Sequence, residues 1–315
     1  MKIKPSAISR GSRLKKSDGE GFRFFSSDKT FDIINTVLLV LVFVVVAYPL
    51  YYILIASFSQ PEMVLNGLVT VFPRGFRLDS YVRVFQNQEV LRGYWNSIMY
   101  TTVGTIINLV VTLPAAYAMS RADLKGRKVL TIFFAFTMFF GGGLIPTFIV
   151  VDRLGMVNTF WAMVIPNAMS VWNMLICRNF FQTNIPGELL ETSQMDGCTN
   201  RSFFVQVVLP LSKAIIAVMI LFYAVGHWNS FFNALVYLRD ADRMPLQMVL
   251  RRLLVMAEPD PSMGAEMRED WVRMLMEVEM LKYALVVVAS VPVLALYSLV
   301  QKHFVQGIMI GSIKG

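Results

Sequence analysis

Apolar residues along the chain fall into long blocks that are separated by shorter polar stretches. An α-helix needs roughly 20 apolar residues to cross a bilayer. Six blocks come near or exceed this length, and they cover residues 31–58, 96–119, 129–150, 160–177, 214–238 and 281–300. The fourth block is the shortest of the six. The pattern therefore predicts an all-α integral membrane protein with six transmembrane helices.

The composition supports this prediction. Of the 315 residues, 56% are hydrophobic and 16% are charged, whereas soluble domains hold about 45–50% apolar and about 25% charged residues. The first apolar block is longer than the core of a signal peptide, and no small-residue cleavage site follows it. We therefore expect it to remain as the first span, behind a basic tail over residues 1–30.

Basic residues gather on one side of the predicted spans. The tail 1–30 holds eight Lys and Arg residues, and the same side receives 120–128, 178–213 and the carboxyl end. The opposite loop 151–159 holds only Arg153. Because basic loops stay in the cytoplasm, both termini and 178–213 are predicted to be cytoplasmic. Anchoring of this face explains the net charge of +8, so no nucleic-acid partner is expected.

Polar side chains inside the spans are neutral and recur at helical spacing. Charged residues are absent from the span interiors, although carriers driven by protons or sodium usually keep a few. Two interpretations stay open for the neutral groups: a wet pathway for sugar hydroxyls and ring faces, or helix packing through cross-helix hydrogen bonds. The candidate pathway residues are Asn108, Trp172, Asn173, Trp228, Asn229, Phe232 and Asn233. His227 is interpreted as a satisfied core group.

Two segments on the outer side show other patterns. Residues 245–256 place their leucines and valines on one helical face, which predicts an amphipathic helix at the outer membrane surface. In the third span, "GGGLIP" at 141–146 predicts an interrupted or kinked helix. Such a break is compatible either with bordering a substrate path or with close packing.

Signatures of catalysis are missing from the sequence. It contains no G-x-x-x-x-G-K-[ST], H-E-x-x-H, G-x-S-x-G or C-x-x-C pattern. The two histidines, His227 and His303, leave little material for an active site. We therefore expect a non-catalytic chain that binds no cofactor and no metal itself.

The polar stretch 178–213 predicts a helix–turn–helix that cannot enter the membrane. Pro186 suits a first helical turn, Asp196-Gly197 suits a helix end, and Thr199 or Asn200 can cap a second helix. That second helix has an apolar side with no lipid to cover it, formed by Phe203, Phe204, Val207 and Val208. Pro210 is expected to separate it from the fifth span. A protein-docking elbow and a plain loop both fit these observations.

The same stretch resembles the EAA loop of ABC-importer permeases. The matching positions are Glu191, the turn Asp196-Gly197, Val207 and Leu209-Pro210; Thr192-Ser193 and Cys198 stand where the pattern has alanines. The segments "GHWNSFFNALVYL" and "FVQGIMIGSIKG" resemble the carbohydrate-uptake branch, which includes maltose permeases. "GGGLIPTF" and "MPLQMVLRRLL" are similar to its polysaccharide and oligosaccharide permeases. The resemblance covers about residues 30–315.

The resemblance implies a permease domain over 31–315 in a bacterial cytoplasmic membrane. It implies a second permease subunit, an extracytoplasmic sugar-binding protein, a sugar substrate and a cytoplasmic ATPase dimer that holds ATP and Mg²⁺. The implied ATPase-coupling residues are Glu191, Asp196, Gly197, Phe204 and Pro210. A stand-alone secondary carrier and a non-transporting assembly or sensor subunit remain as alternatives.

Overall fold

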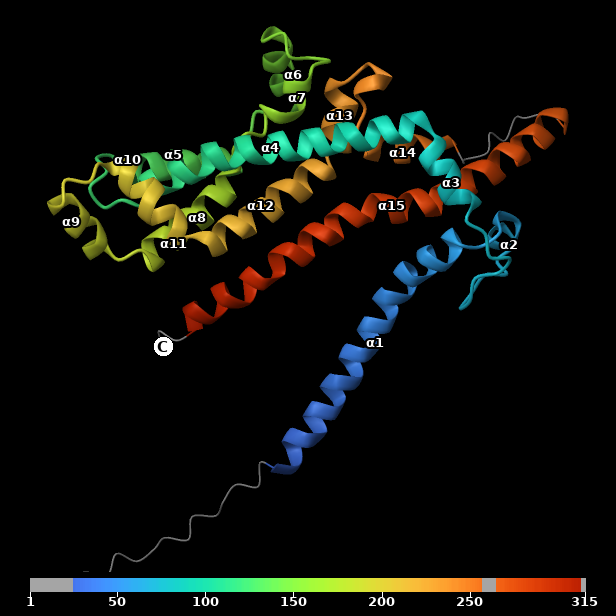
Figure 1. Ribbon diagram of the computed structural model, residues 1–315, viewed down its shortest axis with the longest axis horizontal. Helices are drawn as coiled ribbons and strands as arrows, with labels where there is room; N and C mark the ends of the chain where they lie inside the picture. Colours follow the sequence, from blue (N-terminus) through green and yellow to red (C-terminus); the bar gives the residue numbers. More distant parts are fainter. Residues whose placement is uncertain (1–24, 257–264, 313–315) are drawn as a thin grey trace, which may run out of the picture. The chain divides into compact units, whose positions relative to one another are not determined.

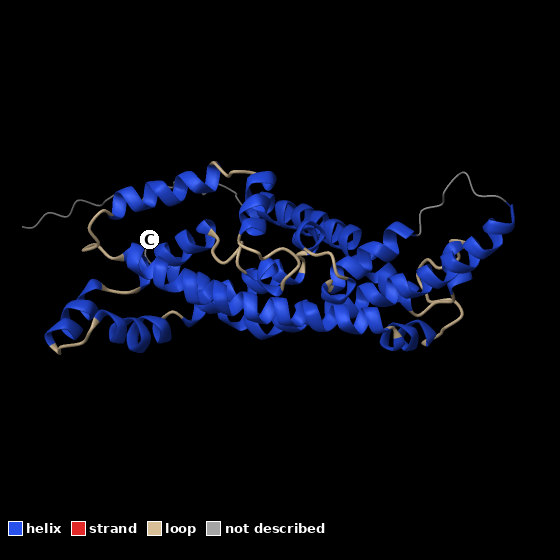
Figure 2. Ribbon diagram, turned by 90° about the horizontal axis from the view of Figure 1, so that it is seen from above, coloured by secondary structure: helices blue, strands red, loops and turns tan. Residues whose placement is uncertain are grey.

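The computed structural model describes residues 25–256 and 265–312, and every regular element in these ranges is a helix (Figures 1 and 2). Contacts divide the chain into two units, Met1–Tyr51 and Tyr52–Gly315. Most of α1 (Phe25–Ser57), with Pro49 inside it, belongs to the first unit. Most of the predicted tail 1–30 lies outside the described residues.

The second unit contains the remaining helices. In chain order they are α2 (Pro61–Leu65), α3 (Asp79–Gln86), α4 (Gln88–Ser120), α5 (Arg127–Phe139), α6 (Leu144–Arg153), α7 (Phe160–Val164), α8 (Val171–Asn184), α9 (Gly187–Met195), α10 (Asn200–Phe203), the π-helix η1 (Phe204–Val208), α11 (Leu209–Leu211), α12 (Lys213–Trp228), α13 (Phe231–Tyr237), the 3-10 turn η2 (Ala241–Arg243), α14 (Leu246–Met256) and α15 (Ala265–Ser312).

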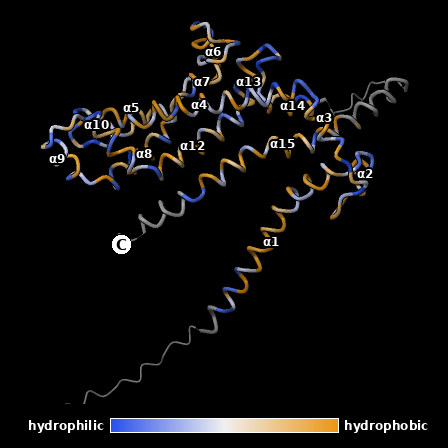
Figure 3. Tube along the Cα trace, viewed as in Figure 1, coloured by the Kyte–Doolittle hydropathy of each residue, from blue (hydrophilic) through white to orange (hydrophobic). Residues whose placement is uncertain are grey.

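Three helical segments in the described ranges are long and apolar enough to cross a membrane: Lys29–Ser57, Gln88–Ser120 and Leu281–Lys302. Two bent pairs raise the total to five if each pair is one span. The hydrophobic colour along α1 and the middle of α15 in Figure 3 reflects this composition. The fold is thus all-helical with three to five candidate spans, and the number six stays a prediction.

Three predicted spans differ from the structure. Residues 129–150 form α5 and α6, which meet at 109° around a break that contains Gly143, with φ at +81°. The interruption predicted for 141–146 is therefore confirmed, because the positive φ of Gly143 breaks the helix in a way that glycine permits. Residues 160–177 are divided between α7 and α8. Residues 214–238 are also divided, because α12 ends at Trp228 and α13 begins at Phe231.

Helix α4 organises the packing of the second unit. It packs against α8 and α12, and α12 in turn packs against α15 (Figure 1). One hydrophobic core joins the carboxyl half of α4 to α8, α10, η1 and α12, and its members include Ala116, Met174 and Met219. A second core joins α3, α4, α14 and α15 around Val84 and Leu285. The ends of α4 are therefore fixed in two separate cores.

The amphipathic helix predicted for 245–256 is present as α14, but its apolar face is covered by protein. Leu246 is fully buried, and Val249 is 7% exposed in the core with α4 and α15. The Ser97 hydroxyl on α4 accepts a hydrogen bond from the Leu246 backbone N–H at 2.9 Å. Two long helices, α4 and α15, therefore cover this apolar face, and the location of α14 at the outer membrane surface stays a prediction.

Candidate functional site

Helix α9 ends in a tight turn at the predicted position. The Cys198 N–H donates to the Ser193 carbonyl at 2.9 Å, and the Gly197 N–H donates to the Gln194 carbonyl at 3.1 Å. This pair of bonds is the Schellman motif, which satisfies the last carbonyls of a helix and needs a left-handed residue. Gly197 supplies it with φ at +76°. The local sequence therefore fixes this turn.

The side chains around this turn are exposed. Glu191, Asp196 and Gly197 all lie on the surface of the described chain, and Met195 is 89% exposed. A Cβ built on Gly197 would meet nothing within 4 Å. Figure 1 shows α9, α10 and α11 grouped at one end of α4, α8 and α12, and Figure 3 shows hydrophilic colour around α9. The turn is thus free to meet another molecule.

The helix after the turn is anchored to the chain's own core. Thr199 caps α10, with its hydroxyl accepting from the Ser202 N–H at 3.3 Å. Phe203 and Val208 are buried, and the Phe204 ring lies 5.1 Å from the Tyr117 ring of α4. The expectation of an uncovered apolar side is therefore wrong for Phe203 and Val208, because α4 and α8 cover it. We call residues 187–211 the elbow.

Pro210 is exposed, and the direction of the chain changes two residues after it. The segment Asn200–Leu211 meets Lys213–Trp228 at an angle of 82°. Ser212, at the bend, is fully buried. The π-helical turn η1 comes immediately before Leu209-Pro210, and such turns add a residue to a helix. The elbow therefore enters α12 through a sharp bend.

Arg121, which directly follows α4, connects that helix to the elbow. Its Nη1 donates to the Asn200 Oδ1 of α10 at 2.8 Å and to the Tyr117 hydroxyl at 3.1 Å. Its Nε donates to the Asp123 Oδ1 at 2.7 Å. The Arg121 side chain is 10% exposed, and the hydrogen bond from its guanidinium holds the pKa of the Asp123 carboxyl below its usual value. Arg121 is therefore a charged joint between α4 and α10.

Side chains from α8 cap the carboxyl end of α4. The Arg178 Nε donates to the Met119 carbonyl at 3.1 Å, and the Gln182 Nε2 donates to the Ser120 carbonyl at 3.3 Å. Cationic and amide donors suit this end of a helix, where carbonyls lack partners. A cleft of about 630 Å³ lies between α9 and the loop after α4, and both Arg121 and Glu191 line it.

Two of the candidate pathway residues, Asn108 and Asn173, are buried among the helices. Asn108 is fully buried; its Nδ2 donates to the Asn167 carbonyl at 2.6 Å, and its Oδ1 lies 2.6 Å from the His227 Nε2. Both amide groups of Asn108 thus have partners inside the chain, which fits the packing interpretation. A role of Asn108 in the substrate pathway stays a prediction. His227 is, as expected, a hydrogen-bonded core residue.

A second polar contact joins α4 and α12 at the next turn. The Thr112 hydroxyl lies 2.7 Å from the Tyr223 hydroxyl, and the latter also accepts from the Ser170 N–H at 3.3 Å. Asn173 is 8% exposed beside this contact, and its N–H donates to the Ser170 hydroxyl at 3.4 Å. Asn173 is therefore buried in this conformation too. These groups act as cross-helix hydrogen bonds, one of the two predicted alternatives.

Of the other five candidates, one is buried and four lie nearer the surface. Trp228 is buried, and its Nε1 donates to the Ala289 carbonyl of α15 at 3.0 Å. Asn229 is exposed immediately after it. Trp172 is 60% exposed and Phe232 is 50% exposed, and Asn233 is half-buried. The structure therefore does not gather the seven candidates into one cavity.

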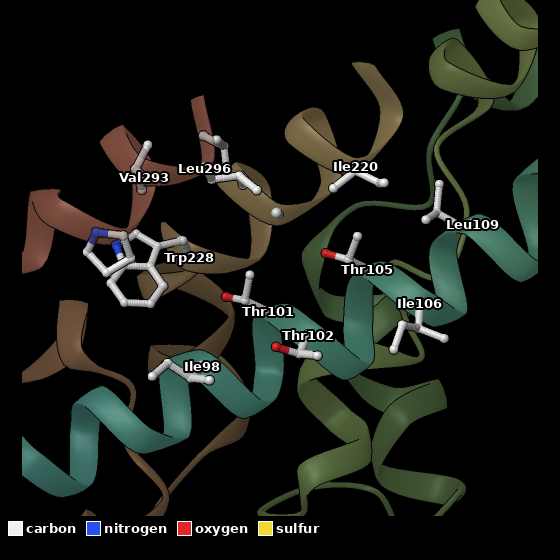
Figure 4. Close-up of a pocket in the computed structure, with 13 residues that line it drawn as sticks. Ile98, Thr101, Thr102, Thr105, Ile106, Leu109, Ile220, Trp228, Val293 and Leu296 are labelled. Carbon is white, nitrogen blue, oxygen red and sulfur yellow. The ribbon is translucent and has the colours of Figure 1, made fainter. Parts of the chain in front are cut away.

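A pocket of about 400 Å³ lies between α4, α12 and α15 (Figure 4). Thr101, Thr105 and Trp228 line it together with aliphatic side chains. Within the described residues, the hydroxyls of Thr101 and Thr105 are buried without a hydrogen-bond partner. The pocket is mainly apolar, so it is poorly suited to bind a sugar. No group of acidic, Cys and His side chains suited to a metal occurs in the described residues.

The sequence interpretation missed several residues of the elbow's attachment. The sequence assigns no role to Arg121 or Tyr117 and indicates Asn200 only as a possible helix cap, because no spacing along the chain connects residue 121 to residue 200. The only available signal was an arginine directly after an apolar block. The sequence places Arg178 and Gln182 in the predicted loop 178–213, because their partners are carbonyls of another helix and leave no local pattern.

These observations define a multi-pass membrane protein with a helical elbow exposed at one end of its helices. No family model matches the chain. Protein LplC of Bacillus subtilis (strain 168) is 39% identical over 287 residues, which are 91% of this chain and 96% of LplC. The polygalacturonan/rhamnogalacturonan transport system permease protein YtcP of the same organism is 36% identical over 288 residues, which are 91% of this chain and 99% of YtcP.

A solved structure is also similar to this chain. The crystal structure of a bacterial ABC transporter involved in the import of the acidic polysaccharide alginate contains a chain with 32% identity and a TM-score of 0.79. The match covers 88% of this chain and 98% of that one. The chain belongs to the family of ABC-transporter permease proteins, as the elbow's sequence indicates. This membership favours an ABC permease over a stand-alone carrier or a sensor subunit.

Proposed function

We propose that the chain is a membrane subunit of an ATP-driven bacterial importer of oligosaccharides. It forms half of the pathway beside a second permease, and its elbow docks on a cytoplasmic ATPase dimer. ATP and Mg²⁺ bind to that dimer, so this subunit is not itself an enzyme. An extracytoplasmic protein delivers the sugar. Six spans, cytoplasmic termini and the bacterial cytoplasmic membrane complete the proposal.

The observation that carries the coupling proposal is the contrast between the two arms of the elbow. The first arm, α9 and its turn, exposes Glu191, Asp196 and Gly197. The second arm is held by buried Phe203 and by Arg121 at the end of α4. A partner that moves the first arm therefore moves α4 through the second. This is the geometry that a mechanical link requires.

The substrate class rests on the relatives and on what the helices lack. YtcP is named for the transport of polygalacturonan and rhamnogalacturonan, and another relative, AraQ of Bacillus subtilis, is named for arabinooligosaccharides at 23% identity. The span interiors hold no charged residue that would serve proton or sodium coupling. Energy must then enter from outside the membrane, which fits a separate ATPase.

The test is ATP-dependent uptake by the assembled complex. The chain is purified in mild detergent with its co-purifying subunits, identified by mass spectrometry, and reconstituted into liposomes with ATP inside. We expect an ATPase, a second permease and a binding protein, and labelled oligosaccharide uptake that stops with a non-hydrolysable ATP analogue. Uptake by the chain alone, without ATP, would refute the proposal in favour of a secondary carrier.

A further inference from the structure

One exposed face of α14 meets the turn between α12 and α13. Gln247 and Arg251 are four residues apart, so they share this face. The Gln247 Nε2 donates to the Asn229 Oδ1 at 3.5 Å. The Arg251 guanidinium lies 5.8 Å from the centre of the Phe231 ring. We call Asn229, Phe231, Gln247 and Arg251 the α14 cluster.

The cluster borders a groove of about 380 Å³. Asn229 and Gln247 line it, together with Trp228, Ser290 and aliphatic side chains of α14 and α15. This volume falls within the range of small-molecule sites, about 300–1,000 Å³. The pocket of Figure 4 has threonine hydroxyls but no carboxamide, whereas the groove has two carboxamides and a hydroxyl on its walls. Amides and hydroxyls can both donate to and accept from sugar hydroxyls.

Arg251 adds a positive charge that the described part of the chain does not neutralise. The adjacent Arg252 lies 3.5 Å from the Glu89 carboxylate of α4. Among the side chains that the structure describes, no ion pair includes Arg251, and its guanidinium is exposed over Phe231. A planar guanidinium binds a carboxylate through two parallel hydrogen bonds. The combination of ring, two amides and guanidinium is therefore suited to an acidic sugar.

We propose that the α14 cluster binds carboxylate-bearing sugar residues of the transported oligosaccharide, and that Arg251 recognises the carboxylate. The inference rests on the proposed function and adds two statements to it. The substrate class includes uronates, and this subunit contacts the substrate directly. One face of α14 is apolar and packs inside the protein. The opposite, polar face thereby gains a separate role in substrate specificity.

The test compares one ligand pair across three variants of the reconstituted complex. The ligands are trigalacturonate and its trimethyl ester, which differ in charge but share ring and hydroxyls. We expect Arg251→Gln to lower kcat/KM for uptake of the acid by about tenfold or more, since a charge-assisted pair is lost. Uptake of the ester should change less than about twofold. Arg251→Lys keeps the charge and should retain part of the preference.

Arg252→Gln is the matched control, since it removes an adjacent charge that already has a partner in Glu89. It should leave the ratio of acid to ester uptake unchanged. The same binding protein is used with every variant. Its own preference for acid or ester therefore cancels when uptake by a variant is divided by uptake by the wild type. Equal losses for acid and ester in Arg251→Gln, which a lipid-anchoring or purely structural arginine would produce, overturn the inference.

Two further outcomes separate the inference from the proposed function. If the wild-type complex imports the ester or a neutral oligosaccharide with ATP, yet never prefers the acid, the inference fails and the proposed function stands. If it imports no oligosaccharide of either kind and none stimulates ATP hydrolysis, both fail. A preference for the acid that only Arg251 variants abolish supports both.

Discussion

Replacement of Gly197 by aspartate separates docking from folding. Gly197 has φ at +76°, and a residue with a Cβ pays about 1–2 kcal/mol in this region, with Asp among the residues that tolerate it best. The new Cβ meets no described atom within 4 Å. The Schellman bonds use backbone groups and survive. The variant should therefore lose only about 1 kcal/mol of stability and remain in the assembled complex.

The effect on transport should be much larger. If the turn fits into the ATPase, Gly197→Asp buries an unpaired carboxylate at that contact, which costs several kcal/mol. Coupled uptake and sugar-stimulated ATP hydrolysis should then fall by about a hundredfold, as a cost of about 3 kcal/mol implies. The assay is ATP-driven uptake in liposomes, normalised to the amount of assembled complex recovered by size-exclusion chromatography.

Gly155→Asp provides the control for backbone strain. Gly155 has φ at +67° and also has nothing within 4 Å of a built Cβ, but it lies in the predicted outer loop 151–159. Uptake by this variant should stay close to that of the wild type. Unchanged uptake and ATP hydrolysis in Gly197→Asp would refute the docking argument. Equal losses in both variants would assign the effect to strain instead.

The remaining predictions concern α4. Arg121→Gln should lower sugar-stimulated ATP hydrolysis severalfold without preventing assembly, because the link between α4 and α10 loses its charge-assisted bonds. Unchanged stimulation would show that Arg121 does not transmit motion from the elbow to α4. Gly104→Ala should lower the thermal midpoint of the purified subunit, because its Cβ would lie 2.5 Å from the His227 Cε1, an overpacking worth about 1–3 kcal/mol. Gly226→Ala, where nothing lies within 4 Å, is the control and should hold or raise the midpoint.

The buried polar pairs explain how neutral residues can be frequent in the spans without lining a path. Asn108 with His227, and Thr112 with Tyr223, join α4 to α12 at successive turns. Gly104 lies against the same His227 ring, which brings the two helices close together. Small residues and cross-helix hydrogen bonds are the usual means of packing helices in membranes. The interface of α4 and α12 is therefore specific in register as well as apolar.

Local sequence determined the features that depend on neighbouring residues. The apolar blocks followed from composition over roughly 20 residues. The turn at Gly197, the cap at Thr199 and the helix after Pro245 followed from residue preferences within a single helical turn. Their positions agree with the structure because the hydrogen bonds that define them join residues no more than five apart.

Only the tertiary structure decided which polar groups form hydrogen bonds inside the chain and which apolar groups are buried there. Periodicity places Asn108 and Asn229 on helical faces in the same way, yet one is buried against His227 and the other borders a groove. The sequence does not indicate that α4, α8 and α15 cover the apolar faces of α10 and α14. The joint of Arg121 with Asn200 spans 79 positions. Contacts at such separation depend on how the helices pack, and no pattern within one segment contains that information.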